Sequence, residues 1–123
     1  MNHNTRKTGT WYEQNAAEYL KCQGLVILAH NYRCRFGEID LIARDGRYVV
    51  FVEVKYRRNG SSGVSLEAVT PAKQRVISRV AQFYLIVKYN SVDVPCRFDV
   101  VGIDGDRLQW KKNAFEYQTG MKI

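Results

Sequence analysis

The sequence predicts a mixed α/β fold with the element order α-β-β-β-α-β-β and helices on both faces of the sheet. Three observations favour this class. Two segments have the pattern of amphipathic helices, one strand-like run is apolar at both odd and even positions, and two Asp-Gly turns lie between strand-like runs. A strand, a long helix and another strand form a crossover connection, which places two strands parallel. The sheet is therefore expected to be mixed.

The first helix is expected over residues 10–23. Thr10 and Glu13 have the spacing of a capping box, in which two side chains satisfy backbone amides at the start of a helix. Apolar residues follow them at helical intervals until a glycine ends the segment. The apolar run 25–29, rich in branched residues, then predicts the first strand.

A hairpin is expected next, formed by the strand-like runs 36–43 and 47–56 on either side of an Asp45-Gly46 turn. Asp-Gly between apolar runs is among the strongest short-range hairpin signals. The second run is apolar at both odd and even positions at its start. This pattern is typical of a central strand that is covered on both faces.

The second half of the chain predicts a helix over residues 71–88 and two more strands. Thr70 is suited to the N-cap, and Pro71 to the first helical position. Apolar residues at spacings of three and four indicate an amphipathic helix. Strands are expected at 96–103 and 107–111, joined by the second Asp-Gly turn.

Length and composition indicate one globular domain. The chain has 123 residues, of which 46% are hydrophobic and 25% charged. We expect a flexible basic N-terminal tail over 1–8, a single domain over 9–116 and a C-terminal tail over 117–123. The first residues are polar and no apolar stretch is long enough for a membrane span, so a cytoplasmic protein is expected. Three separated cysteines without a CxxC pair predict reduced thiols.

The charge balance favours a polyanionic partner. The chain has 19 Lys and Arg against 12 Asp and Glu, which leaves a net charge of +7. Nucleic acid is the first candidate and an anionic membrane surface the second. No basic amphipathic helix with a broad, bulky apolar face is evident, so no membrane partner is expected.

Acidic residues gather in the predicted hairpin. If Asp-Gly fills the two central positions of the turn, Asp40 opposes Phe51 and Glu38 opposes Glu53. Opposed residues share a face, and the face repeats every two residues, so Lys55 points the same way. The backbones of Asp40 and Glu53 would then lie roughly 7 to 8 Å apart, close enough for their carboxylates to meet at one cation.

Converging carboxylates on an apolar sheet repel each other, and burial increases the cost. Lys55 can offset part of this charge, and a divalent metal with oxygen ligands can offset the rest. Beside a phosphodiester, such a metal would polarise a phosphoryl oxygen while the lysine orients the water. A purely structural ion-pair cluster is the alternative interpretation.

Three motifs carry a resemblance to a known family: Gly37–Ala43 (GEIDLIA), Val50–Lys55 (VFVEVK) and Pro95–Val101 (PCRFDVV). In this order and spacing they resemble the YraN-like family of small bacterial proteins, which are similar to Holliday-junction resolvases. The similarity extends over about residues 6–115. It implies a restriction-endonuclease-like fold of the PD-(D/E)xK superfamily.

The resemblance also implies an activity and the residues that perform it. It suggests an endonuclease dependent on Mg²⁺ or Mn²⁺ that hydrolyses DNA phosphodiester bonds at branched or junction structures, as a homodimer. Asp40 and Glu53 would be metal ligands, Lys55 the catalytic lysine, and Glu13 a further ligand from the first helix. Ile39 stands where the superfamily's literal motif has proline. For Glu13, the capping box is the competing role.

Two further carboxylates are secondary candidates. Glu38 would either take part in the chemistry or bond a neighbouring amide or cation. Asp99 lies in an apolar strand, where a structural role competes with one in the site, and a buried carboxylate needs partners.

Basic residues follow the third predicted strand and start the second helix, where the helix macrodipole disfavours cations. We expect them to form a basic rim that contacts the nucleic-acid backbone, although a solvated helix face is the alternative. These residues are Arg57, Arg58, Lys73, Arg75 and Arg79. A nucleic-acid-binding or scaffold protein that keeps the fold without catalysis is the rival to the nuclease interpretation.

Overall fold

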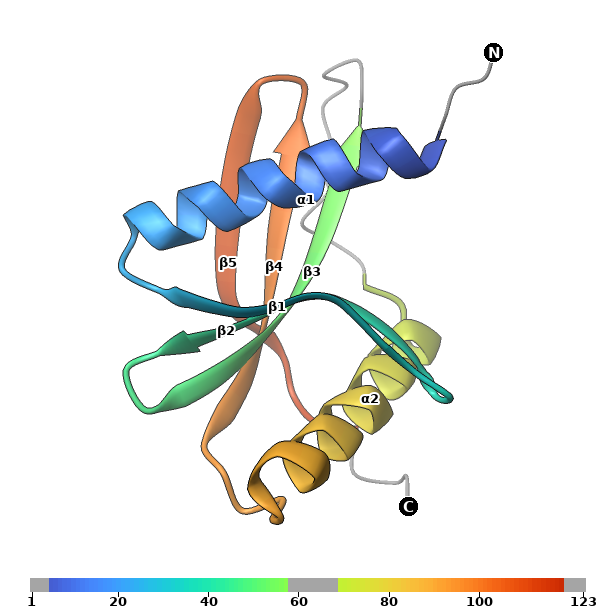
Figure 1. The fold of residues 1–123 in the computed structure, drawn as a ribbon. Helices are drawn as coiled ribbons and strands as arrows, with labels where there is room; N and C mark the ends of the chain where they lie inside the picture. The colour runs from blue at the N-terminus through green and yellow to red at the C-terminus, as the bar shows by residue number, and fades with distance from the viewer. Residues whose placement is uncertain (1–4, 58–68, 119–123) are drawn as a thin grey trace.

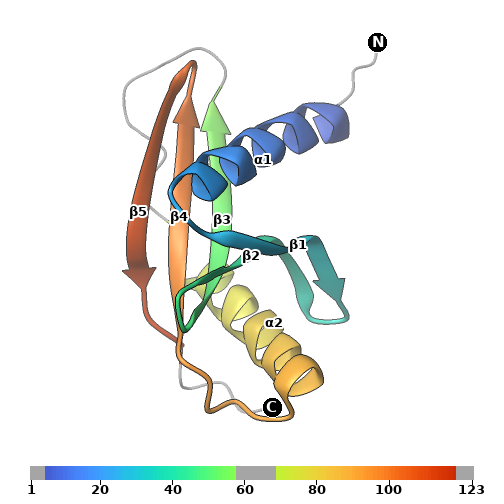
Figure 2. The same ribbon diagram turned by 60° about the vertical axis from the view of Figure 1, so that its left-hand side comes forward.

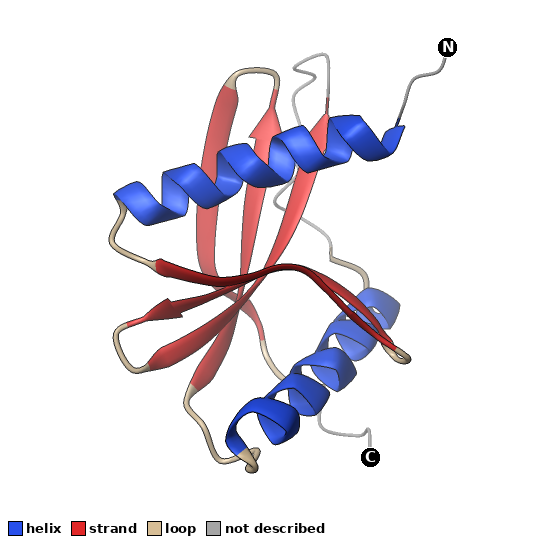
Figure 3. Cartoon of the chain, in the orientation of Figure 1, coloured by secondary structure: helices blue, strands red, loops and turns tan. Residues whose placement is uncertain are grey.

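The computed structural model describes residues 5–57 and 69–118, and of residues 5–10 and Arg57 it describes only the backbone. The elements follow the expected order α-β-β-β-α-β-β and confirm the mixed α/β class (Figures 1 and 3). They are α1 (Thr5–Cys22), β1 (Val26–Cys34), β2 (Gly37–Asp45), β3 (Tyr48–Arg57), α2 (Pro71–Tyr89), β4 (Cys96–Asp104) and β5 (Arg107–Phe115).

The five strands form one mixed sheet in the order β1-β2-β3-β4-β5. Neighbouring strands are antiparallel except β3 and β4, which are parallel, with Phe51 beside Phe98. The helix α2 makes the connection between these two parallel strands (Figure 2). The crossover predicted from the strand-helix-strand order is therefore confirmed.

Each helix covers one face of the sheet. Ala16 and Leu20 of α1 pack in one core with Val50 and Val52, whereas Phe51 packs in a second core with α2. β3 is thus buried on both sides, as its apolar run at both parities predicted. Neither helix, within the described ranges, is long and apolar enough to cross a membrane.

Helix α1 begins at Thr5, five residues before the expected start. The backbone is already helical at Thr10, so the predicted N-cap at that residue is wrong. The helix continues through Gly9 because a single glycine costs only about 1 kcal/mol in a helix interior. Of the expected N-terminal tail, residues 5–8 are helical and residues 1–4 lie outside the described chain.

The β2–β3 hairpin has a different register from the one expected. Asp45 pairs with Tyr48 and Ile42 with Phe51, so the predicted pairing of Asp40 with Phe51 and of Glu38 with Glu53 is wrong. The central turn residues are Gly46 and Arg47, and Gly46 has φ +60°. A positive φ at the first central position suits a turn with glycine there. The shift is two residues, an even number, so alternation along the paired strands assigns the same faces in both registers.

Strand β5 is longer than predicted and ends at Phe115. The pairing with β4 shifts between Phe98 and Val100, and Asn113 on β5 has a φ of +53°. A bulge therefore interrupts the strand without ending it. The run of polar residues in this part of the sequence concealed the continuation.

Gly37, at the start of β2, approaches α2 closely. Its φ is +144°, and a Cβ there would lie 2.6 Å from the Cγ1 of Val76. Gly37→Ala should therefore lower the free energy of unfolding by about 2–3 kcal/mol, through backbone strain and a clash with a stiff β-branched side chain. Urea denaturation measures the loss.

Gly46→Ala is the matched control, because its φ is +60° but a Cβ there would meet nothing within 4 Å. This variant should lose only about 1 kcal/mol, from strain alone. Adding Val76→Ala to Gly37→Ala should recover the part caused by the clash. Equal losses for the two glycine variants would contradict the close approach to α2.

Candidate functional site

The candidate site lies where β2 and β3 separate. Their last pair is Leu41 with Val52; beyond it β2 continues beside β1, and β3 continues beside β4 (Figure 2). The backbone N–H of Val54 donates a 2.8 Å hydrogen bond to Oδ2 of Asp40. The Asp40 carboxylate thus replaces a backbone partner at this fork.

Three polar residues lie side by side on β1, β2 and β3 at the fork: Asn31, Asp40 and Glu53. Asp40 and Glu53 lie directly beyond the last β2–β3 pair, which places them opposite each other. Asn31 lies between two residues paired with β2 and falls opposite Asp40 on its other side. Its φ is +50°, a conformation that asparagine tolerates better than most residues. Such local strain is often found at functional sites.

Glu13 reaches the same group from α1. Its carboxyl interacts with Asp40 and is hydrogen-bonded by the side chain of Asn31. A helix residue thus joins the strand residues at the end of the β2–β3 ladder. Because Thr10 is inside the helix, the competing capping-box role of Glu13 does not hold.

The three carboxyl groups are held in an environment that favours protonation. Burial, with the nearby charge of Asp40, raises the pKa of Glu13 and that of Glu53 to about 7. Burial also raises the pKa of Asp40, against the lowering effect of the Val54 amide and Lys73. When they are all ionised, these carboxylates repel one another. A further positive charge nearby would therefore stabilise their ionised forms.

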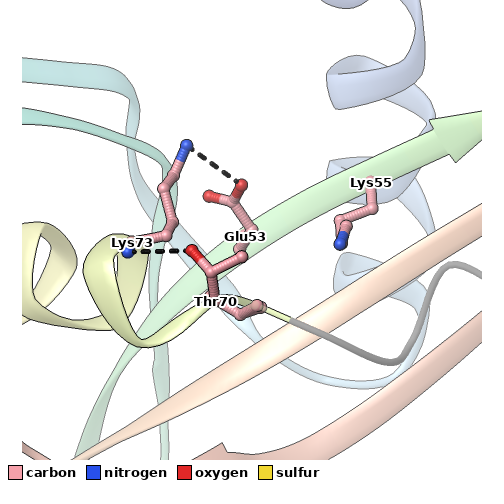
Figure 4. A pocket seen from close by; sticks show the side chains of 5 residues that line it. Glu53, Lys55, Thr70 and Lys73 are labelled. Carbon is pink, nitrogen blue, oxygen red and sulfur yellow. Dashed lines mark hydrogen bonds and ion pairs between the residues drawn. The ribbon is translucent and has the colours of Figure 1, made fainter.

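A pocket of about 240 Å³ adjoins this group (Figure 4). It is lined by Glu53, Lys55, Val69, Thr70 and Lys73. Lys55 follows Glu53 by two residues on β3, as the sequence predicted for their shared face. The pocket therefore combines a carboxylate with two ammonium groups.

The start of α2 forms one wall of the pocket. Thr70 caps the helix, as expected, and its Oγ1 accepts a 3.2 Å hydrogen bond from the backbone N–H of Lys73. The Nζ of Lys73 lies 3.4 Å from Oε2 of Glu53. Lys73, expected on a rim, instead contacts one of the site carboxylates directly.

The other expected basic residues are distributed along α2 and β3. Arg75 is exposed, and the guanidinium of Arg79 lies 4.7 Å from the ring centroid of Phe36, in the β1–β2 turn. Of Arg57 only the backbone is described, and Arg58 lies outside the described residues. Among the basic residues of α2, only Lys73 is thus seen against the described site carboxylates.

The two secondary carboxylates have different locations. Glu38 lies near the site: it pairs with Arg33 at 3.2 Å, and its charge raises the pKa of Asp40. Asp99 lies on the α1 face, two residues from Val101 of that core, whereas Glu53 faces α2. Asp99 is fully buried and bonded to Arg97, so the structure does not bring it to the site.

Asn31 belongs to this group, although no sequence pattern singled it out. The run around it predicts only the continuation of a strand, yet asparagine is depleted in strands and tolerates positive φ. An asparagine within a strand-like run was the available signal. Its partnership with Glu13 depends on tertiary structure and has no counterpart in local sequence.

The metal-free protein should become less stable as the pH rises. The folded-state pKa of Glu53 is about 7, against an ordinary value of 4.5, so the unfolded chain releases this proton first. Glu53 should therefore cost about 1–3 kcal/mol of unfolding free energy between those two pKa values, with no further loss above them. Urea denaturation with EDTA, from about pH 4 to about pH 8, measures this slope.

Glu53→Gln should flatten that slope, whereas Glu116→Gln, which changes an exposed carboxylate, should leave it unchanged. Comparing the two variants isolates Glu53 from other titrating groups. If wild type and Glu53→Gln show the same pH dependence, the raised pKa of Glu53 is wrong.

The described residues include no group of three or more His, Cys, Asp or Glu that could hold a metal ion. What they do provide is an opposed carboxylate pair, a third carboxyl from α1 and lysines beside a pocket. Fold and site thus define a mixed α/β protein with an acidic and lysine-bearing site at the fork of its sheet.

The chain belongs to the uncharacterised protein family UPF0102, whose family model matches residues 12–103. This confirms the family membership expected from the three motifs. A UPF0102 protein of Lachnoclostridium phytofermentans is 50% identical over 92% of this chain and 96% of its own length. The one from Syntrophus aciditrophicus is 49% identical over 98% and 96%, and that from Alkalilimnicola ehrlichii is 50% identical over 89% and 86%.

Proposed function

We propose that this protein is a metal-dependent endonuclease of the restriction-endonuclease-like PD-(D/E)xK type, which hydrolyses DNA phosphodiester bonds. The observation that carries the proposal is the fork, where Asp40 and Glu53 lie opposite each other and Lys55 follows on the same face. Motif resemblance supports the superfamily, and this convergence supports the chemistry.

The donor set fits Mg²⁺ or Mn²⁺. Both ions prefer oxygen ligands, and Mg²⁺ is usually held by one or two carboxylates together with waters and substrate phosphates. Asp40 and Glu53 would hold the ion, and Glu13, which contacts Asp40, would support it from α1. Burial, and after it the nearby charge of Asp40, raises the pKa of Glu13 and of Glu53, so a bound cation would stabilise their ionised forms.

The bound metal would polarise a phosphoryl oxygen and offset the charge of the phosphodiester. Lys55 would orient the attacking water and stabilise the negative charge that develops on the phosphoryl oxygens. Asp40 keeps its orientation through the backbone N–H of Val54, which donates to its Oδ2. The chain therefore supplies position and charge, which are the main requirements of phosphoryl chemistry.

The basic residues would bind the nucleic-acid backbone. Lys73 and Arg75 are exposed at the start of α2, and the net charge of +7 favours a polyanion. Contacts to phosphates position a nucleic acid without reading its sequence. The resemblance to junction resolvases suggests branched DNA as substrate and a homodimer with two sites.

The deciding experiment is a cleavage assay with branched, single-stranded and duplex DNA, each with Mg²⁺, with Mn²⁺ and with EDTA. We expect cleavage in Mg²⁺ or Mn²⁺ that EDTA abolishes, with branched DNA cut most efficiently. Salt-sensitive DNA binding without cleavage under any of these conditions would overturn the proposal in favour of a non-catalytic binding protein.

A further inference from the structure

Lys73 occupies a position that the helix itself disfavours. It lies in the first turn of α2, where the positive end of the helix dipole repels a cation. Its Nζ lies 3.4 Å from Oε2 of Glu53, and this contact offsets the repulsion. The ammonium therefore acts as a counter-ion of a carboxylate that the proposed function assigns to a metal.

The ion pair is built so that Lys73 can leave and Glu53 cannot. The Lys73 side chain is 47% exposed, whereas that of Glu53 is 14% exposed and held within β3. The hydrogen bond that caps α2 uses the backbone N–H of Lys73 and not its side chain. A flexible lysine stem can thus move its charge without disturbing the start of the helix.

We propose that Lys73 is a resident cation that a divalent metal replaces at Glu53, and that the released ammonium then binds a phosphate of the nucleic acid. The proposal deepens the proposed function and rests on it. Two cations cannot both approach one carboxylate closely without repulsion, and the metal carries the larger charge. The pocket beside Glu53, lined by Lys55 and Lys73, gives the displaced ammonium an anionic partner when a phosphodiester enters (Figure 4).

Replacement of the lysine should change two affinities in opposite directions. Lys73→Met keeps much of the length of the stem but removes the competitor of the metal, so Mn²⁺ alone should bind roughly three- to tenfold more tightly. The same variant should bind DNA several-fold more weakly in Ca²⁺, because it has lost the released ammonium. Isothermal titration with Mn²⁺ and fluorescence anisotropy with a short DNA duplex and a four-way junction measure the two effects.

Two variants separate this role from general charge. Lys88→Met removes an exposed lysine from the last turn of the same helix and should leave both affinities within about twofold of wild type. Lys73→Arg restores the cation and should return Mn²⁺ affinity to the wild-type value or below it, because arginine can bind a carboxylate through two hydrogen bonds.

If Lys73→Met binds Mn²⁺ no more tightly than wild type, the proposal that the metal replaces the Lys73 ammonium at Glu53 is wrong. Unchanged DNA affinity in this variant would overturn the transfer of the ammonium to phosphate. A lysine that only stabilises the fold would leave Mn²⁺ affinity unchanged or weaken it. The Mn²⁺ titration requires no cleavage, so failure of the proposed nuclease activity is distinguishable from failure of this exchange.

Discussion

Asp40→Asn should abolish metal-dependent DNA cleavage, lowering the rate by at least about 1,000-fold. Asp40 is the carboxylate at the centre of the fork, opposite Glu53 and in contact with Glu13. Removing its charge takes away a proposed metal ligand and leaves the site with one strand carboxylate. The asparagine carbonyl still accepts the hydrogen bond from Val54, so the fold should be retained.

Asp106→Asn makes the same chemical change at an exposed residue of the β4–β5 turn and should cleave as wild type does. Initial rates on the best substrate, with thermal unfolding as a check of folding, measure the difference. Retention of wild-type activity by folded Asp40→Asn would contradict the assignment of this residue to the metal.

Asp99→Ala should lower the free energy of unfolding by about 3–5 kcal/mol. The carboxylate is fully buried and accepts hydrogen bonds from Arg97 at 3.0 Å, from the Trp110 indole at 2.9 Å and from the backbone N–H of Asn113 at 2.9 Å. Alanine would leave these donors without their acceptor. Arg97 would keep only its ion pair with the partly exposed Asp45, and the loss of its buried partner adds the larger part of the cost.

Asp45→Ala provides the comparison within the same network. Asp45 also bonds Arg97, at 2.9 Å, but its side chain is 34% exposed. Its removal should cost about 1 kcal/mol, because water can replace the interaction in part. Urea denaturation of both variants measures the difference. Similar losses for the two would show that the buried position of Asp99 is not what makes it important.

The face of the acidic group was predictable, but its register was not. Side chains alternate along a strand, so Glu53 and Lys55 share a face in any register, and the two-residue shift kept Asp40 with them. The predicted turn is wrong because Asp-Gly is compatible with more than one placement of glycine. Gly46 adopts φ +60° as the first central residue, a choice that also positions Asp45 to bond Arg97.

The other features that the sequence did not predict depend on contacts between segments that are distant in the chain. Glu13 meets the pattern of a capping box, and only the helix start at Thr5 shows that the pattern is unused. No local signal joins Lys73 to Glu53, because the pairing depends on how α2 crosses the sheet. The last strand continues past its predicted end through a bulge at Asn113. The backbone N–H of Asn113 bonds the Asp99 carboxylate of β4, a contact that local sequence does not reveal.

The irregular outer strands affect how copies of this chain can meet. β1 and β5 form the two edges of the sheet, and the pairing of each with its inner neighbour is interrupted by a register shift. β5 also carries the exposed Lys111 and Lys112. Bulges and lysines on an edge oppose the addition of a strand from another molecule. We therefore expect this protein to resist edge-to-edge aggregation and any homodimer to associate through helices or loops, leaving the sheet five strands wide.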